Sequence, residues 1–261
     1  MKKIILLFIF FSIKNVFAQS EMSIFYSNGT IAHIPIANID SMYYVNISNV
    51  CPPTLTDIDG NIYNTVEIGT QCWMKENLKT KHFNNGGSIL TGLNNSQWSN
   101  TTSGACSDYN NDTSNTAIYG KLYNWYAVID PAGLCPVGWH EPKNSEWNYL
   151  IKTLDPNADT SCVSCISSLI AGGLLKETGN SHWLSPNTGA TNSSGFNALP
   201  AGMRSSSNGY YSQLGNYAYF WTVTPYSNNS SFYHSFLTNS AEVRSYNLLY
   251  GTGFSVRCIK D

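Results

Sequence analysis

Two cysteines in Cys162-Val-Ser-Cys165 have the spacing of a redox or zinc motif. Zinc would need a second cysteine pair or nearby histidine ligands. A redox pair would need a strand before it and a helix after it, within a βαβ pattern. Neither context surrounds this pair. We therefore expect a local structural disulfide between Cys162 and Cys165, in place of a redox or metal site.

The stretch Asp57-Ile-Asp59-Gly60-Asn61 resembles the start of a calcium-binding loop. An EF-hand loop requires glycine at its sixth position and glutamate at its twelfth, and these positions hold Ile62 and Ile68. An Asp-Gly pair between two apolar runs is typical of a hairpin turn. The sequence therefore predicts strands over residues 54–58 and 62–68 joined by a turn, and no metal site.

No combination of residues in the chain predicts a catalytic centre. The sequence lacks the His-Glu-x-x-His, Gly-x-Ser-x-Gly and phosphate-binding Gly-Lys-Ser/Thr patterns. The histidines are scattered, and they are His33, His82, His140, His182 and His234. Four glutamates could supply a glycosidase pair, although no spacing selects two of them: Glu67, Glu76, Glu146 and Glu177. We expect no catalytic residue, no cofactor and no enzyme, and a structural hydrogen bond for His140.

Tyrosines alternate with Asn and Ser in the turn-rich stretch over residues 204–250. Tyrosine rings stack on sugars or fill protein interfaces, and Asn and Ser add adaptable hydrogen bonds at low charge. Half or more of these tyrosines could equally be ordinary strand residues. With Trp98 as a further loop aromatic, the predicted ligand-binding residues are Tyr210, Tyr211, Tyr217, Tyr226, Tyr233, Tyr246 and Trp183.

Other large or charged side chains are assigned to the scaffold. Large aromatics at regular strand and helix positions bury the most area, which predicts core positions for Trp73, Trp125, Trp139, Trp147 and Trp221. Arg257 follows Val256 on the last expected strand, and we expect it to pair with a buried acid, with Glu146 as a candidate.

Residues 1–18 have the order of a cleavable secretory signal peptide. Lys2 and Lys3 precede an apolar run over residues 4–11, and the segment closes on Ala18. The apolar run is well short of the roughly 20 residues that span a bilayer as a helix. We expect a secreted or cell-surface protein without a transmembrane segment.

Composition and cysteine usage agree with export. Without residues 1–18 the chain keeps 11 basic and 16 acidic side chains, a formal charge of −5, which makes nucleic acid a poor partner. Charged residues make up only 11% of the chain, so its surface is mostly neutral and polar. All 7 cysteines follow residue 18, and an oxidising compartment favours disulfides. An odd number leaves at least one thiol over, and counting gives no connectivity.

The predicted elements form a small unit followed by a large one. Residues 19–50 predict a β-hairpin unit, with strands over 23–26 and 31–36, an Asn-Gly turn between them and another short strand near 42–44. The Cys51-Pro52-Pro53 joint then begins a main domain over residues 51–261.

Within the main domain, helices come early and strands late, the order of an α+β fold. Leu122, Trp125, Tyr126 and Ile129 fall on one face of a short helix. A second helix is predicted over residues 144–154, with Trp147, Leu150, Ile151 and Leu154 on its buried side. Short strands are predicted over 196–204, 210–214, 219–224, 232–237, 242–248 and 254–259.

Six motifs in order resemble the bacterial Fibrobacter succinogenes major paralogous domain family. They begin at Val66, Tyr119, Cys135, Gly195, Phe220 and Ser255, and they read VEIGTQCWMKENL, YGKLYNW, CPVGWH, GFNALPAG, FWT and SVRC. The resemblance covers roughly residues 54–261, and residues 23–45 resemble the small β element that often precedes such domains. Lys143 stands where the family usually has Ser or Thr, so we expect the helix cap to move to Asn144.

The family also looks like the C-type-lectin-like superfamily, which includes the formylglycine-generating enzymes. The residues that carry this likeness are Trp139-His140-Glu-Pro142 with Glu146-Trp147, Phe220-Trp221-Thr222 and Val256-Arg257-Cys258. The resemblance implies a lectin-like fold with two helices, paired antiparallel sheets and long loops. It also implies a bridge from Cys135 to Cys258. A second expected bridge joins Cys51 to Cys72 and leaves Cys106 as the odd cysteine.

Fold alone does not assign a site. Calcium-dependent lectins combine a Glu-Pro-Asn loop with a later Trp-Asn-Asp triplet, which is absent here. Formylglycine-generating enzymes use two nearby C-terminal cysteines, whereas only Cys258 lies near this end. We therefore expect an exported, non-catalytic recognition or adhesion module that binds a glycan or a protein at the cell surface. The alternatives are a structural component of an extracellular assembly and, less favoured, an enzyme related to the formylglycine-generating type.

Overall fold

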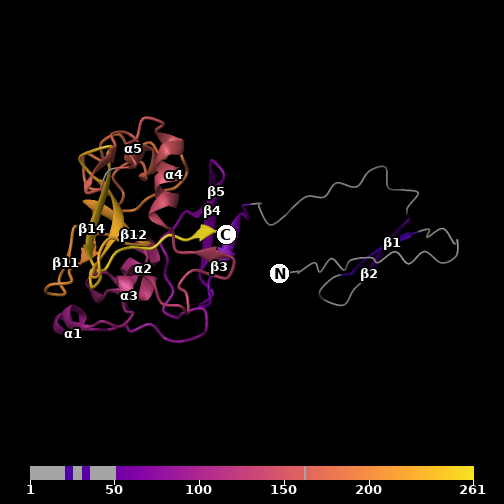
Figure 1. Ribbon diagram of the computed structural model, residues 1–261, viewed down its shortest axis with the longest axis horizontal. Coiled ribbons are helices and arrows are strands. Elements are labelled where there is room, and N and C mark those ends of the chain that lie inside the picture. The colour runs from indigo at the N-terminus through magenta and orange to yellow at the C-terminus, as the bar shows by residue number, and fades with distance from the viewer. Residues whose placement is uncertain (1–20, 26–30, 36–50, 162) are drawn as a thin grey trace. The chain divides into compact units, whose positions relative to one another are not determined.

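The computed structural model describes residues 21–25, 31–35, 51–161 and 163–261 (Figure 1). The expected signal peptide and the short strand expected near residues 42–44 lie outside the described residues. The chain divides into two units, residues 1–50 and residues 51–261, and each is described by itself.

The first unit contains one described hairpin. Strand β1 (Glu21–Phe25) pairs antiparallel with β2 (Ile31–Pro35), with Phe25 opposite Ile31 and Glu21 opposite Pro35. Two strands were predicted here at nearly these bounds, and the Asn-Gly turn between them lies outside the described residues.

The second unit begins and ends in one five-stranded antiparallel sheet. Its order is β3-β4-β5-β15-β8, with β3 (Thr54–Thr56), β4 (Ile62–Ile68), β5 (Gln71–Met74), β15 (Ile259–Lys260) and β8 (Trp139–His140). Figure 1 shows the yellow C-terminal strand beside the indigo first strands of this unit. The last strand therefore lies directly against β5, where Ile259 pairs with Trp73 although the two are 186 positions apart in the sequence.

A second sheet of four strands carries most of the C-terminal half. Its order is β12-β13-β14-β9, with β12 (Tyr217–Pro225), β13 (Ser230–Leu237), β14 (Val243–Leu249) and β9 (Cys165–Ser168). Successive side chains of a strand point to opposite faces. Phe220, Phe236 and Val243 accordingly lie on the face that packs in the core with Trp147. The edge strand β9 was not predicted.

Short elements fill the connections between the sheets. The α-helices are α1 (Asn95–Asn100), α2 (Thr113–Tyr119), α3 (Trp125–Val128), α4 (Asn144–Leu154) and α5 (Ala171–Leu175), with a 3-10 turn at Tyr109–Asn111. The two-stranded pairs are β6 (Cys106–Ser107) with β7 (Leu122–Tyr123), and β10 (Met203–Arg204) with β11 (Tyr211–Ser212). The fold is thus mixed α and β, with mostly antiparallel sheets. Two helices were expected, and the described residues contain five, four of them with seven residues or fewer. None of these helices has the length and apolar character needed to cross a membrane.

Helix α4 has the predicted bounds, but its cap differs from the prediction. Trp147, Leu150 and Ile151 are buried on its inner face. The N-cap residue is Lys143 and not Asn144, because the Glu146 carboxylate accepts the Lys143 backbone N–H at 2.7 Å. This bond satisfies one of the free N–H groups at the helix start without a Ser or Thr side chain.

The first predicted helix was wrong in its first turn. Leu122 and Tyr123 form strand β7, because the backbone of Tyr123 exchanges both hydrogen bonds with Phe254. The helix starts only at Trp125, after Asn124 accepts the Ala127 N–H as its cap. Backbone pairing with a distant segment therefore decides the conformation of Leu122 and Tyr123, despite the helical spacing of the apolar residues.

Buried aromatic side chains dominate two neighbouring cores. In one core Trp147 lies 5.0 Å from Trp73 and 5.3 Å from Phe220 between ring centroids. In the other core Phe254 packs against Trp221 at 4.6 Å. Four of the five tryptophans assigned to the core are at most 5% exposed, and Trp139 is half-buried.

Arg257 is fully buried and forms no ion pair with an acid among the described residues, which corrects the pairing expected with Glu146. Its Nε donates to Asn77 Oδ1 at 2.9 Å, and its Nη2 donates to the Asn197 carbonyl at 2.8 Å. Nη1 donates to the carbonyls of Phe196 and Met74. Burial lowers the pKa of Arg257 to about 9. Neutral acceptors on several segments thus replace the expected carboxylate.

A second buried cation joins the end of strand β13 to the loop that follows it and to the turn at Thr188. Lys176 Nζ donates to the carbonyls of Thr188, Leu237 and Ser240 at 3.0, 2.7 and 2.8 Å. An ammonium group has three donors, so all of them are satisfied. Burial lowers the pKa of Lys176 to about 8.

Disulfides join Cys51 to Cys72 and Cys135 to Cys258, the two bridges that were expected. Cys106 is a buried free thiol, and burial raises its pKa to about 12. Cys165 is disulfide-bonded, and Cys162, the partner expected for it, lies outside the described residues.

Candidate functional site

Four tyrosines on three neighbouring strands form one cluster, which we call the tyrosine cluster: Tyr217 and Tyr219 on β12, Tyr233 on β13 and Tyr246 on β14. Tyr217 and Tyr219 stack at 5.2 Å between ring centroids. Tyr233 lies 5.8 Å from Tyr219 and 6.4 Å from Tyr246. Tyr233 and Tyr246 are direct cross-strand partners, so the sheet register holds these rings together.

The tyrosine cluster packs against the core through Phe254, and the described residues do not use its hydroxyls. Phe254, which is fully buried, packs against Tyr219 at 4.7 Å and against Tyr233 at 4.8 Å. Tyr217, Tyr233 and Tyr246 remain half-buried. None of the four hydroxyls hydrogen-bonds to another described residue. The arrangement therefore offers ring surface and free hydroxyls on a rigid base.

Burial and the neighbouring phenols raise the pKa values of two tyrosines of the cluster, Tyr219 and Tyr233. Burial, followed by the neighbouring Tyr246 and Tyr217, raises the pKa of Tyr233 to about 12. Burial also raises the pKa of Tyr219, with Tyr233 and Tyr217 adding to the effect. Neutral hydroxyls can both donate and accept hydrogen bonds.

One charged residue borders the cluster. The Arg244 guanidinium lies close enough to Tyr219 and Tyr233 to oppose the rise in their pKa values. Its Nε and Nη2 donate to Glu242 Oε2 at 3.2 and 3.1 Å, so the local charge is largely balanced. Arg244 and Tyr219 were missing from the predicted ligand residues, and the alternation of Tyr217, Tyr219 and Trp221 along one strand was the signal for Tyr219.

Three other predicted ligand tyrosines lie outside the cluster. Tyr210 is 62% exposed and Tyr226 is 50% exposed. Tyr211 instead contacts Tyr109 at 5.3 Å and donates a hydrogen bond to Asn111 Oδ1. The structure thus brings together three of the six predicted tyrosines.

The prediction for Trp183 was wrong. Trp183 is 1% exposed, and its Nε1 donates to the Ala198 carbonyl at 3.0 Å. Trp98, which was also expected in a loop, lies on helix α1 and is fully buried. The turn residues around Trp183 suggested a surface loop, but that loop folds its ring into the core, where a surface ligand cannot contact it.

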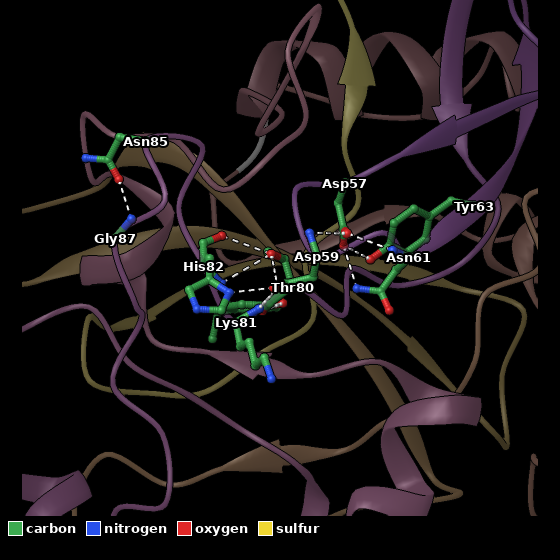
Figure 2. Close-up of polar contacts among 10 residues, drawn as sticks. Asp57, Asp59, Asn61, Tyr63, Thr80, Lys81, His82, Asn85 and Gly87 are labelled. Carbon is green, nitrogen blue, oxygen red and sulfur yellow. Dashed lines mark hydrogen bonds and ion pairs between the residues drawn. The ribbon is translucent and has the colours of Figure 1, made fainter. Parts of the chain in front are cut away.

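The Asp57–Asn61 loop is a closed hydrogen-bond network (Figure 2). Asp57 Oδ1 accepts the backbone N–H groups of Asp59 and Asn61 at 3.0 and 2.9 Å. Asp57 Oδ2 accepts the Asn61 amide at 2.8 Å and the Tyr63 hydroxyl at 2.6 Å. These contacts fix the turn between β3 and β4, and they occupy the oxygens that a cation would use.

Asp59 ties this turn to a second loop, as Figure 2 shows. Its Oδ2 accepts Thr80 Oγ1 at 2.8 Å and the Lys81 N–H at 2.7 Å, and its Oδ1 lies 2.5 Å from His82 Nδ1. Burial alone would raise the pKa of Asp59, but these three hydrogen bonds lower it to about 2. Within the described part of the chain, no group of three His, Cys, Asp or Glu side chains could hold a metal ion.

Two of the histidines occupy defined structural positions. His140 Nε2 lies 2.8 Å from Glu146 Oε1 at the start of α4. His234 is fully buried, stacks on Trp147 at 5.1 Å, and contacts Asn144 Oδ1 and Ser245 Oγ at 3.0 and 2.9 Å. Burial lowers the pKa of His234 to about 3. His234 and Ser245 are buried and Asn144 is half-buried, and their contacts join strands β13 and β14 to the start of helix α4.

Comparison with known proteins gives one match. The family model described as Fibrobacter succinogenes major domain matches residues 66–260. No curated protein and no solved structure matches the chain.

Proposed function

Since the chain belongs to the Fibrobacter succinogenes major domain family, we propose that it is an exported, non-catalytic module that binds a glycan through the tyrosine cluster. The observation that carries this proposal is the set of four adjacent tyrosines whose hydroxyls have no partner among the described residues. Such rings stack on the apolar faces of sugars, and their hydroxyls bond sugar hydroxyls.

Charge favours a neutral ligand. Arg244, the charged residue beside the cluster, is already engaged by Glu242 at 3.1 Å. Burial and the neighbouring tyrosines raise the pKa values of Tyr219 and Tyr233, so these two phenols are uncharged at neutral pH. Binding of a neutral polysaccharide therefore removes little water from charged groups.

The disulfides support export, because structural bridges persist in oxidising compartments. They join Cys51 to Cys72 and Cys135 to Cys258. We further propose a C-type-lectin-like fold. Support comes from the last strand, β15, which lies in one sheet with the first three strands of the unit. The bridge from Cys135, before α4, to Cys258, next to β15, and the long connections with short helices agree with this fold.

The test measures binding of purified chain, without residues 1–18, to a glycan array and to insoluble neutral polysaccharides. Tyr217→Ala and Tyr246→Ala should each weaken binding about tenfold or more, equivalent to about 1.4 kcal/mol of binding free energy. Tyr217→Phe and Tyr246→Phe separate the contribution of the hydroxyl from that of the ring. Unchanged thermal unfolding of each variant shows that its fold is retained.

Tyr210→Ala is the matched control, because Tyr210 is an exposed tyrosine outside the cluster. Binding should change less than twofold in this variant. The proposal fails if no glycan is bound, or if the cluster variants and the control lose affinity equally. Binding to whole cells that protease treatment removes and glycosidase treatment leaves would show a protein partner instead.

A further inference from the structure

The described residues contain three pairs in which Asp or Asn is followed directly by glycine: Asp59-Gly60, Asn85-Gly86 and Asn208-Gly209. Such a pair can react with itself, because the backbone nitrogen of the glycine can attack the side-chain carbonyl carbon of the residue before it. Glycine leaves this approach open, since it has no Cβ beside the attacking nitrogen. A fourth pair, Asn28-Gly29, lies outside the described residues.

The Asp59 side chain is held in a form that resists this attack. Its Oδ2 accepts the Thr80 hydroxyl and the Lys81 N–H, and its Oδ1 lies 2.5 Å from His82 Nδ1. These bonds lower the pKa of Asp59 to about 2, so the group is a carboxylate at neutral pH. The carbon of a carboxylate is a poor target for a nucleophile, and the two asparagines remain as candidates.

The two asparagines share one side-chain geometry. Asn85 Oδ1 accepts the Gly87 N–H at 2.8 Å, a contact that Figure 2 shows. Asn208 Oδ1 accepts the Tyr210 N–H at 3.0 Å in the same way. In both turns the side chain bonds the backbone two residues on, so it folds back over the peptide that leads to the glycine. The donated N–H also stabilises negative charge on Oδ1 when a nucleophile attacks the adjoining carbon.

The surroundings of the attacking nitrogen differ between the two turns. Gly86 N donates to the Phe83 carbonyl at 2.8 Å, and this bond must break before the nitrogen can lose its proton and turn toward the side chain. Gly86 is exposed, and a Cβ placed on it would have no atom within 4 Å. The loop at Asn85 therefore has room for the backbone rotation that the attack requires.

The loop at Asn208 lacks this room. Gly209 is buried, and a Cβ placed on it would lie 2.3 Å from the Asn95 carbonyl oxygen. Its own carbonyl accepts Nε of the fully buried Arg204 at 3.0 Å. Rotation of the Gly209 backbone would break this bond and press against Asn95, so the fold opposes the attack.

We infer that Asn85 is a site of spontaneous deamidation and that the fold protects Asn208. The Gly86 nitrogen bonds to the side-chain carbonyl carbon of Asn85, and its proton leaves with Nδ2 as ammonia, which produces a cyclic imide. Water then opens one of the two imide carbonyls and leaves aspartate or isoaspartate at position 85. Either product places a negative charge at the exposed end of the loop that follows Lys81 and His82.

The direct test is peptide mapping by mass spectrometry of the full mature chain, sampled over time in mildly alkaline buffer. Position 85 should convert about tenfold faster than position 208 or more, equivalent to about 1.4 kcal/mol of activation free energy. Equal rates, faster conversion at position 208, or no conversion at position 85 would overturn the inference. The measurement uses the unaltered protein, so it does not depend on whether a variant folds.

Unfolding separates the effect of the fold from that of the local sequence. In concentrated urea the protection of Asn208 should disappear, and the two positions should convert at similar rates. A difference that persists in urea would contradict a role for the packing of Gly209.

Ion-exchange chromatography supplies a matched pair of variants. Acidic species should accumulate in wild type and in Asn208→Ser, but not in Asn85→Ser. Serine keeps a side-chain oxygen in each turn and removes the amide that reacts. Accumulation of the same acidic species in Asn85→Ser would place the reaction elsewhere. This site does not depend on glycan binding, and either proposal can fail while the other holds.

Discussion

His140 Nε2 lies 2.8 Å from Glu146 Oε1, a contact that joins strand β8 to helix α4. The other ring nitrogen, Nδ1, lies 2.7 Å from Asp261 Oδ1. The hydrogen bond to Glu146 is the main cause of a raised pKa for His140, and Asp261 adds to it against the effect of burial. Burial alone would raise the pKa of Glu146, but the bonds from His140 and Lys143 lower it.

These shifts predict a pH dependence of stability. The native pKa of His140 lies above the unfolded value of about 6.5, so its contribution is complete below that pH and declines as pH rises through the native pKa. The contribution should stay below about 1 kcal/mol, because the ring is 32% exposed. Urea unfolding of wild type and His140→Gln between pH 5.5 and pH 9 measures it. The stability difference should shrink toward high pH, and a difference that grows would contradict the assignment.

Lys176→Met should destabilise the second unit by about 3 kcal/mol or more. The variant keeps much of the side-chain volume but leaves the buried carbonyls of Thr188, Leu237 and Ser240 without their donor. Lys152→Met is the matched control, since Lys152 is exposed and makes one long contact. Urea midpoints of the two variants give the comparison. A loss below about 1 kcal/mol for Lys176→Met would mean that water replaces the ammonium group.

Removing Cys135–Cys258 should cost more stability than removing Cys51–Cys72. The bridges close loops of 123 and 21 residues, for which chain entropy predicts about 5 and about 3 kcal/mol. The measurement is denaturant unfolding of the two double Cys→Ala variants under oxidising conditions. The reverse order would show that native contacts, and not loop length, decide the contribution.

Chelator should leave the Asp57–Asn61 loop unaffected, whereas Asp57→Ala should destabilise the unit by about 2 kcal/mol. The carboxylate accepts four hydrogen bonds, two of them from backbone N–H groups of its own turn. Thermal unfolding with EDTA or with added calcium tests the first statement, and Asp57→Ala tests the second. A calcium-dependent rise in Tm that disappears in Asp57→Ala would restore the calcium interpretation.

Local patterns predicted elements well where a residue's neighbours in sequence decide its conformation. Helix α4 has the predicted bounds because Trp147, Leu150 and Ile151 follow helical spacing and Glu146 completes the N-terminal cap. The hairpin of β3 and β4 was predicted from its Asp-Gly pair, although its loop extends over residues 57–61.

The secondary-structure predictions were wrong where contacts with segments distant in sequence decide the local conformation. Leu122 has helical spacing with Trp125, yet β7 forms because its partners, Cys106–Ser107 and Phe254, come from elsewhere in the chain. Strand β9 follows Cys162 in a stretch without alternation, and its pairing with β14 alone makes it a strand. Phe196 to Leu199 were predicted as strand but enter the core as irregular backbone.

The sequence predicted that the candidate site would be an aromatic surface, but not which tyrosines form it. The abundance of tyrosine in residues 204–250 indicated an aromatic surface. Which tyrosines meet depends on the register of β13 and β14, where Tyr233 faces Tyr246, and on Phe254 beneath them. Register follows from the lengths of loops and from core packing, and neither can be derived from the composition of a single stretch.

The shared sheet at the two ends of the second unit also determines how a mechanical force would pass through it. Tension between residues 51 and 261 would act on β3, β4, β5 and β15, which are neighbours in one sheet, and on the bridges at Cys72 and Cys258. The tyrosines lie in the other sheet, formed by β12, β13, β14 and β9, outside this load path. An adhesive contact made by those tyrosines could therefore keep its shape while the chain that anchors it is pulled.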